Sequence, residues 1–432
     1  MTSPARHIGE DINLMMAQEL GVVGSSILKK QCAELDIDIK SMSVKDLQQL
    51  AGRLRNVVAP VYGLQKAQTI ERHVLRFQLL FKAEMSGGSA ELFLELANIS
   101  RFLGELEEGL EYVNTARELL DKIDGRKAAA LRAEMHEKAG WLYLDKNELL
   151  SARREMEMAN ELFSGIKDLN GQSRASRGLS KVHWLGNDYK LSRLLAEHAM
   201  EIDGSDINRA RAGTELGVIL TNLGELDKAI ETFLECEKVL LKQGAILEQV
   251  QFYNNLARVY TMKEDWEGAV KYYESNLRIS EKANFFRGQA FTSMNLGEAY
   301  AETGRYREAE ERLDKALELF QELGDRRCLG FSHRNMGILF RKKEEWLRAE
   351  KEFQTSLEIQ KEIGNDYGVA DTLEDMAKMY IFQRDLLRAD HVLSEAIGLF
   401  KMIGAQGRLE RASKIKKGVN EIPQPQWIFE LL

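Results

Sequence analysis

Proline is nearly absent from this sequence of 432 residues. The four prolines are Pro4, Pro60, Pro423 and Pro425, so residues 61 to 422 contain none. Because proline breaks helix interiors, this gap favours a chain that is almost entirely helical. Hydrophobic residues make up 44% of the chain and charged residues 30%, a balance typical of a folded, well-packed protein rather than a disordered one.

Cysteines and long apolar runs are also scarce. The three cysteines, Cys32, Cys236 and Cys328, lie far apart and form no CxxC pair, which fits a reducing compartment without a disulfide framework. No apolar run approaches the roughly 18 residues of a membrane span. The N-terminal stretch MTSPARHIGEDINLMM has no apolar signal core. We therefore expect a cytoplasmic protein without a membrane partner.

Motifs of catalysis and metal binding are missing as well. The seven histidines are scattered, and neither HExxH nor a metal-spaced His/Cys cluster occurs. The sequence has no phosphate-binding glycine loop and no GxSxG motif. A net charge of −8 argues against general affinity for nucleic acid. We expect no enzymatic activity, no cofactor, no metal and no nucleic-acid partner.

What the chain has instead is a repeat. The phrase NNLARVY at 254–260 returns as MNLGEAY at 294–300 and as RNMGILF at 334–340, at steps of 40 residues. Three positions recur at this step: a small residue (Gly217, Ala257, Gly297, Gly337, Ala377), an alanine 12 residues later (Ala229, Ala269, Ala309, Ala349, Ala389) and a bulky residue three before that alanine (Leu226, Trp266, Tyr306, Trp346, Leu386). Such a period indicates a repeat architecture.

The spacing also has a mechanical meaning. A small residue on one helix and an alanine on the next predict close approach of two antiparallel helices, with aromatic residues filling the space to the neighbouring pair. Gly224 and Gly304 predict short turns within a unit. Gly324, Gly364 and Gly404 predict the C-terminal ends of helices.

These residues resemble the tetratricopeptide repeat, whose pattern of Leu-Gly, Tyr, Ala, aromatic and Ala falls on the same offsets. The match is specific over residues 211–404, and weaker units extend it back to about residue 90. The units exceed the usual period of about 34 residues and lack its closing proline. They are similar to the longer-helix repeats of kinesin light chain, Pins-type adaptors and bacterial Rap regulators. The resemblance implies an all-α protein, an α-solenoid of about eight helix-turn-helix repeats over 90–404.

Two segments flank this array. Residues 1–85 do not follow the period and predict four helices, with Ser43 or Asp46 as helix caps; they form either a separate helical domain or a cap on the first repeat. Residues 405–432 predict a capping helix and an apolar tail that contains Trp427 and Phe429. The tail either covers the end of the array or docks onto a partner. Truncation after Asn420 separates the two, because only loss of a cap lowers the melting temperature.

The resemblance implies that the first helix of each unit lines a concave, peptide-binding groove. Carried over by position, the predicted groove residues are Arg174, Arg177, Lys181, Trp184, Arg211, Asn254, Asn255, Arg258, Asn295, Arg334, Asn335 and Arg341. Asn255, Asn295 and Asn335 recur at the repeat step, and an amide that both donates and accepts can bind a peptide backbone. The alternative is that asparagine is merely tolerated there.

These observations predict a non-catalytic adaptor or scaffold that binds a protein or peptide ligand in the groove. The groove residues of the middle repeats are basic on balance, which favours an acidic ligand. One alternative, from the resemblance, is a Rap-like regulator that acts on a response regulator through residues 1–85. Another is a structural subunit that assembles with itself. The sequence leaves the oligomeric state open.

Overall fold

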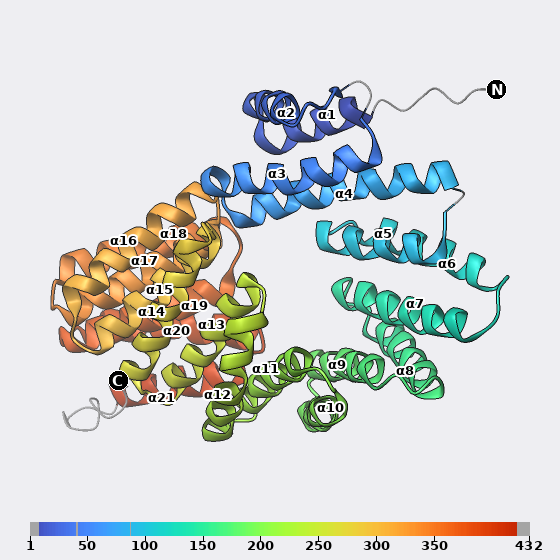
Figure 1. Cartoon of the computed structure of the whole chain (residues 1–432). Coiled ribbons are helices and arrows are strands. Elements are labelled where there is room, and N and C mark those ends of the chain that lie inside the picture. Colours follow the sequence, from blue (N-terminus) through green and yellow to red (C-terminus); the bar gives the residue numbers. More distant parts are fainter. Residues whose placement is uncertain (1–7, 40–41, 87, 421–432) are drawn as a thin grey trace. The chain divides into compact units, whose positions relative to one another are not determined.

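A computed structural model describes residues 8–39, 42–86 and 88–420 of the chain. All regular structure in these residues is helical, with 21 α-helices and no strand (Figure 1), which confirms the all-α prediction. Within them no helix is both long and apolar enough to cross a membrane. The predicted apolar tail lies outside the described residues. The chain forms two compact units: the first unit is Met1–Asn255 with Lys282–Phe285, and the second unit is Leu256–Glu281 with Phe286–Leu432.

Four helices precede the repeats, as predicted, and the other helices follow in pairs. The first four are α1 (Ile8–Leu20), α2 (Val22–Glu34), α3 (Val44–Tyr62) and α4 (Leu64–Ser86). The paired helices are α5 (Ala90–Leu103), α6 (Leu106–Leu120), α7 (Arg126–Asp145), α8 (Leu149–Gly165), α9 (Leu169–Leu185), α10 (Tyr189–Ile202), α11 (Asp206–Asn222), α12 (Leu226–Gln243), α13 (Ile246–Met262), α14 (Trp266–Lys282), α15 (Phe286–Glu302), α16 (Tyr306–Glu322), α17 (Arg326–Lys342), α18 (Trp346–Glu362), α19 (Asp366–Phe382) and α20 (Leu386–Met402), with α21 (Gln406–Asn420) closing the series.

The first four helices share one apolar core. Their fully buried side chains include Ile12, Met16, Leu28 and Leu54. Helix α3 begins with the predicted cap at Ser43: the backbone N–H of Asp46 donates to Ser43 Oγ at 3.3 Å, and the N–H of Ser43 donates to Asp46 Oδ2 at 2.7 Å. This reciprocal pair satisfies two N–H groups that a helix start would leave without partners. The division of the chain into segments 1–85, 90–404 and 405–432 stays a prediction.

In the repeats, the recurring bulky residue marks where the second helix of a pair begins. Leu226, Trp266, Tyr306, Trp346 and Leu386 are the first residues of α12, α14, α16, α18 and α20. The turn before each contains a residue with positive φ, such as Gly224 (78°) and Gly304 (74°). Gly324, Gly364 and Gly404 follow the ends of α16, α18 and α20 with φ of 66°, 66° and 71°. Glycine adopts this conformation without the steric penalty of a Cβ, and the predicted turns are confirmed.

The recurring small residue lies at a close contact between the two helices of a pair, as predicted. A Cβ added to Gly337 would lie 2.6 Å from the Phe353 ring, and one on Gly217 would lie 2.7 Å from the Phe233 ring. The small residue therefore accommodates the bulky side chain 16 positions later, one helical turn beyond the recurring alanine. At Gly297 the alanine also takes part, because the carbonyl oxygen of Ala309 lies 3.3 Å from the same point.

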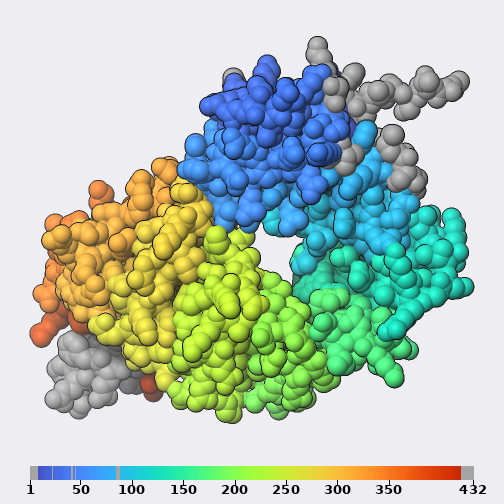
Figure 2. Space-filling view, in the orientation of Figure 1, coloured from blue at the N-terminus to red at the C-terminus, as the bar shows by residue number. Residues whose placement is uncertain are grey.

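The first helices of successive pairs pack against one another. Helix α5 contacts α7 and α7 contacts α9 in the first unit, and α15 contacts α17 and α17 contacts α19 in the second unit. Second helices of successive pairs make no comparably extensive contact within the described parts of either unit. Each unit therefore curves with its first helices on the inner side. On the face shown in Figure 2, the surface of the second unit, coloured mainly yellow and orange, is continuous.

Candidate protein-binding groove

All twelve predicted groove residues lie on first helices, which form the inner side of each unit. Helices α9, α11 and α13 carry those of the first unit: Arg174, Arg177, Lys181, Trp184, Arg211, Asn254 and Asn255. Helices α13, α15 and α17 carry those of the second unit: Arg258, Asn295, Arg334, Asn335 and Arg341. Their role in binding a ligand stays a prediction.

The arginines of α9 and α11 are paired with carboxylates of neighbouring repeats. Arg174 Nε lies 3.0 Å from Glu137 Oε2, and Arg177 Nη2 lies 2.6 Å from Glu215 Oε1. The partners are 37 and 38 residues apart in the chain, which is close to the length of one repeat. Burial opposes the charge of Arg177, but Glu215 raises the pKa of this guanidinium, so it stays cationic. These side chains therefore join neighbouring repeats.

Arg211 is also paired with a carboxylate of a neighbouring repeat: its Nε lies 2.9 Å from Glu248 Oε1. Lys181 instead lies over the ring of Trp184, with Nζ 4.0 Å from the ring centroid. Lys181 is exposed, although nearby protein lowers its pKa by desolvating the ammonium group. The indole Nε1 of Trp184 is buried and has no hydrogen-bond partner. The aromatic face thus positions the lysine on α9.

In the second unit, Arg334 lies among the acidic residues of the last full repeat. Its Nη2 is 2.5 Å from Asp375 Oδ2, and its Nη1 is 3.8 Å from Asp371 Oδ2. Burial would raise the pKa of Asp375, but Arg334 and Lys378 hold it well below its usual range. Burial raises the pKa of Asp371 despite the same arginine. Arg334, one of the basic residues of the middle repeats, is therefore joined by contact to acidic residues of α19.

Further cations close this network. Lys378 Nζ lies 2.8 Å from Asp375 Oδ1 and 3.0 Å from Glu374 Oε1. Arg411 Nε, on α21, lies 3.3 Å from the same Glu374 oxygen. Arg408 Nη2 lies 3.6 Å from Asp371 Oδ2. We call these residues the α19 charge network: Arg334, Asp371, Glu374, Asp375, Lys378, Arg408 and Arg411.

The predicted asparagine ladder is not uniform. Asn255 and Asn295 are half-buried, whereas Asn335 is 9% exposed. Arg258, on the last turn but one of α13, is exposed. Arg341 lies over the Phe382 ring at 5.6 Å, and burial lowers the pKa of this arginine. The sequence places these residues on the right helices, but their accessibility depends on side chains from other repeats.

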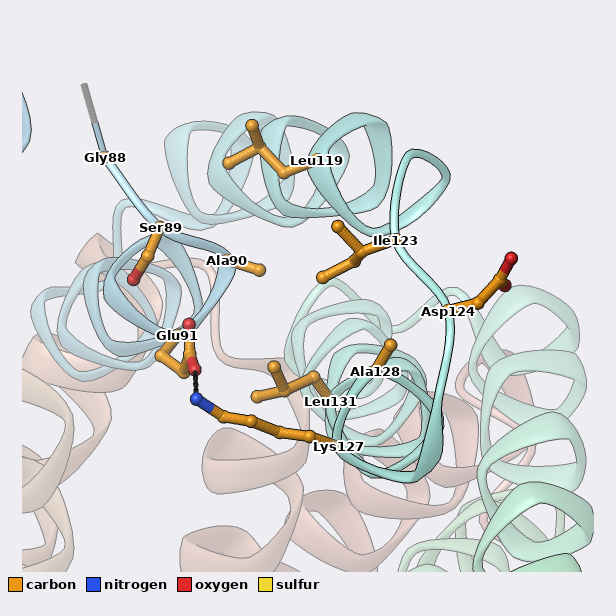
Figure 3. Close-up of a pocket in the computed structure, with 10 residues that line it drawn as sticks. All are labelled: Gly88, Ser89, Ala90, Glu91, Leu119, Ile123, Asp124, Lys127, Ala128 and Leu131. Atoms are coloured by element: carbon orange, nitrogen blue, oxygen red, sulfur yellow. Dashed lines mark ion pairs between the residues drawn. The ribbon is translucent and has the colours of Figure 1, made fainter.

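A hollow of about 410 Å³ lies where α5, α7 and the connection between α6 and α7 meet (Figure 3). The side chains of Leu119, Ile123 and Leu131 line it. On its rim Lys127 Nζ lies 2.7 Å from Glu91 Oε1. Its interior is thus apolar and its rim charges are paired. It offers a place for an aliphatic group and no chemistry of its own.

Reactive groups are few in the part of the chain that the structure describes. It contains no cluster of three or more His, Cys, Asp or Glu side chains that could hold a metal ion. All three cysteines are buried, and burial raises the pKa of Cys32 and Cys236 to about 11 and that of Cys328 to about 12. Such thiols stay protonated near neutral pH and are poor nucleophiles.

The fold places the chain among the helical-repeat proteins, in which each helix pair packs mainly on its neighbours. The sequence model of the tetratricopeptide repeat family matches residues 210–239, 248–322 and 288–362. Over these residues the chain is similar to tetratricopeptide repeats, in line with the sequence resemblance.

Relatives agree with this assignment. Residues of this chain are 28% identical over 221 positions to tetratricopeptide repeat protein 29 of Macaca fascicularis, an alignment that covers 47% of this chain and 46% of that protein. The chain thus matches about half the length of this relative. Among solved structures, aspartyl phosphate phosphatase F of Bacillus subtilis has a TM-score of 0.52 at 16% identity, covering 92% of this chain and 95% of that one. The apo form of RapI has a TM-score of 0.58 at 14% identity, covering 84% and 98%. At these identities the likeness shows the fold.

Proposed function

We propose that this protein is a protein-interaction adaptor that holds a peptide or helix of a partner against the inner faces of its first helices. The observation that supports the proposal is the packing of first helix on first helix, because all the predicted groove residues lie on first helices. The family assignment supports it. So does a neighbour of similar fold, a Rap protein solved in complex with competence and sporulation factor, with a TM-score of 0.51.

Different groove residues have different tasks in this proposal. Half-buried Asn255 and Asn295 offer amides that donate to and accept from a peptide backbone. Exposed Lys181 and Arg258 supply the positive charge that attracts an acidic ligand. Arg174, Arg177, Arg211 and Arg334, which pair with carboxylates of other repeats, keep the repeats in register and border the ligand.

The test begins with capture of a partner by affinity pull-down and identification of its binding segment by mass spectrometry. That segment is then titrated against the wild type and against the triple variant Asn255→Ala, Asn295→Ala, Asn335→Ala. Each amide hydrogen bond typically contributes about 0.5–1.5 kcal/mol, so we expect roughly ten- to a thousandfold weaker binding with little change in melting temperature.

Two controls sharpen this test. Asn114→Ala changes an exposed asparagine on a second helix, α6, and should leave affinity unchanged. The double variant Asn255→Ala, Asn295→Ala keeps Asn335. Its affinity should fall by nearly as much as that of the triple variant, because Asn335 is the least accessible of the three. Wild-type affinity in the triple variant would place the binding surface away from the groove.

A second candidate function is regulation of a response regulator through residues 1–85. The observation that favours it is the extent of the likeness to aspartyl phosphate phosphatase F, which covers 92% of this chain and so includes helices before the repeats. The core shared by α1 to α4 gives such a surface a rigid base. Faster loss of phosphate from a phosphorylated response regulator in the presence of this protein would support the second candidate. An unchanged rate of phosphate loss would contradict the second candidate and leave the adaptor role as the proposed function.

A further inference from the structure

A cavity that contains none of the twelve groove residues named above lies between the helices before the repeats and the first repeat. It has a volume of about 390 Å³ and is lined by Arg72 of α4, by Asn98, Arg101 and Phe102 of α5, and by Asp145 at the end of α7. All these helices belong to the first unit. Two guanidinium groups and one carboxylate give the lining one net positive charge.

The two arginines of this cavity differ in what they contact. Arg101 is held by Asp145, with Nε 2.6 Å from Oδ2 and Nη2 3.4 Å from Oδ1. Its guanidinium also lies over the Trp141 ring, 4.9 Å from the centroid. Arg101 and Asp145 therefore offset each other, and the remaining positive charge of the lining belongs to Arg72.

Arg72 has an aromatic contact and no carboxylate partner. Its Cζ lies 5.3 Å over the ring of Phe102, and no ion pair joins it to a carboxylate of the described residues. Arg76, one helical turn further along α4, shows the contrast: Nη1 lies 2.6 Å from Glu105 Oε2, and Nη2 pairs with Glu108. On helix α4, Arg76 is therefore paired with carboxylates, whereas Arg72 has no ion pair with a carboxylate of the described residues.

We propose that this cavity binds the carboxylate of an acidic side chain on a partner protein. Stacking on Phe102 covers one face of the Arg72 guanidinium and leaves its N–H edge, the geometry that pairs with both oxygens of a carboxylate. The exposed amide of Asn98 can donate a further hydrogen bond. One net positive charge matches a singly charged carboxylate, whereas a phosphate carries nearly two negative charges.

The probe for this site is a fluorescein-labelled peptide of alternating glutamate and glycine, blocked at both ends, followed by fluorescence anisotropy. We expect Arg72→Gln to weaken its binding about tenfold. Arg72→Lys, which keeps the charge but loses the planar fork, should weaken binding several-fold. The matched control is Arg154→Gln, which removes the same charge from an exposed position on α8 and should change affinity less than twofold. Equal affinity of wild type and Arg72→Gln would overturn the proposal.

A second measurement does not depend on a variant. Phenylglyoxal modifies accessible arginines, and mass spectrometry of the wild type then reports each site. The glutamate peptide should protect Arg72 but leave Arg154 reactive, and absence of protection would overturn the site. A glutamine peptide with a free C-terminus should give no protection; if it alone protects, the site takes a chain terminus and the side-chain assignment is wrong. The triple alanine variant of the groove should bind the probe like the wild type, so this site and the groove can fail separately.

Discussion

The guanidinium of Arg334 lies 2.5 Å from the carboxylate of Asp375, in the following repeat. The side chains are 19% and 4% exposed, so the pair is largely removed from water. Taking two charges out of water is unfavourable, and a buried pair need not be more stabilising than apolar residues in its place. Removing one partner is different, because the other charge stays buried alone. Arg334 is therefore needed for the stability of the fold, independently of any contact that it makes with a ligand.

We expect Arg334→Gln to destabilise the second unit. Loss of one member of a buried ion pair typically costs about 3–5 kcal/mol, and Asp375 would keep Lys378 as its ion-pair partner. The control is Arg307→Gln, since Arg307 is 90% exposed and pairs with Glu311 on the same helix. Exposed pairs contribute about 0–1 kcal/mol. Urea unfolding followed by circular dichroism should show a large shift for the first variant only; equal shifts would contradict the assignment.

The same pair predicts how stability depends on pH. The pKa of Asp375 is lower in the folded chain than in the unfolded chain, where it is about 3.9. Its stabilising contribution is therefore fully present above about pH 4 and is lost as the pH falls toward the folded value. Asp371, whose folded pKa is raised by burial, contributes in the opposite sense.

Urea midpoints measured from pH 7 down to about pH 2 test this prediction. Asp375→Asn should be less stable than the wild type at pH 7, and the gap between them should narrow below about pH 4. Asp366→Asn, a change at an exposed position on the first turn of the same helix, controls for the loss of a carboxylate. A gap between wild type and Asp375→Asn that stays constant over this range would refute the prediction.

Two glycines on repeat helices should respond in opposite directions to the same substitution. A Cβ on Gly337 would lie 2.6 Å from the Phe353 ring, whereas a Cβ on Gly398 would meet nothing within 4 Å. We expect Gly337→Ala to destabilise by about 1–3 kcal/mol through overpacking. Gly398→Ala, in the exposed interior of α20, should stabilise by up to about 1 kcal/mol because alanine is the better helix former. Calorimetry that shows both variants shifted in the same direction would refute this packing.

The local structure of the repeats could be predicted from the sequence because it depends on neighbours in the chain. The bulky residues marked where second helices begin, and glycines such as Gly324 marked where helices end. The sequence did not identify Phe353 as the side chain that packs on Gly337, because that choice depends on how far the two helices run past each other. Sequence spacing alone does not fix that offset.

The groove was harder to predict because its residues contact other repeats. The resemblance placed Arg177 and Asn335 on the correct helices, but it did not show that Glu215 neutralises the arginine or that the asparagine is 9% exposed. One signal was present: an arginine and a carboxylate recur 37 or 38 residues apart. Arg72 was missed because it precedes the first repeat and follows no period.

The pair of Arg177 and Glu215 tests whether the groove arginines hold repeats together or bind ligand. Arg177→Glu would face Glu215 with a like charge, so we expect a lower melting temperature and a loss of about 1–3 kcal/mol. The exchanged variant, Arg177→Glu with Glu215→Arg, restores opposite charges and should recover at least half of that loss, because coupling between contacting charges is typically about 0.5–3 kcal/mol. If the exchanged variant also binds the partner segment at near wild-type affinity, Arg177 acts on the fold. Recovered stability with lost binding would instead make Arg177 a ligand contact, and no recovery of stability would show that the ion pair seen between α9 and α11 does not join these repeats.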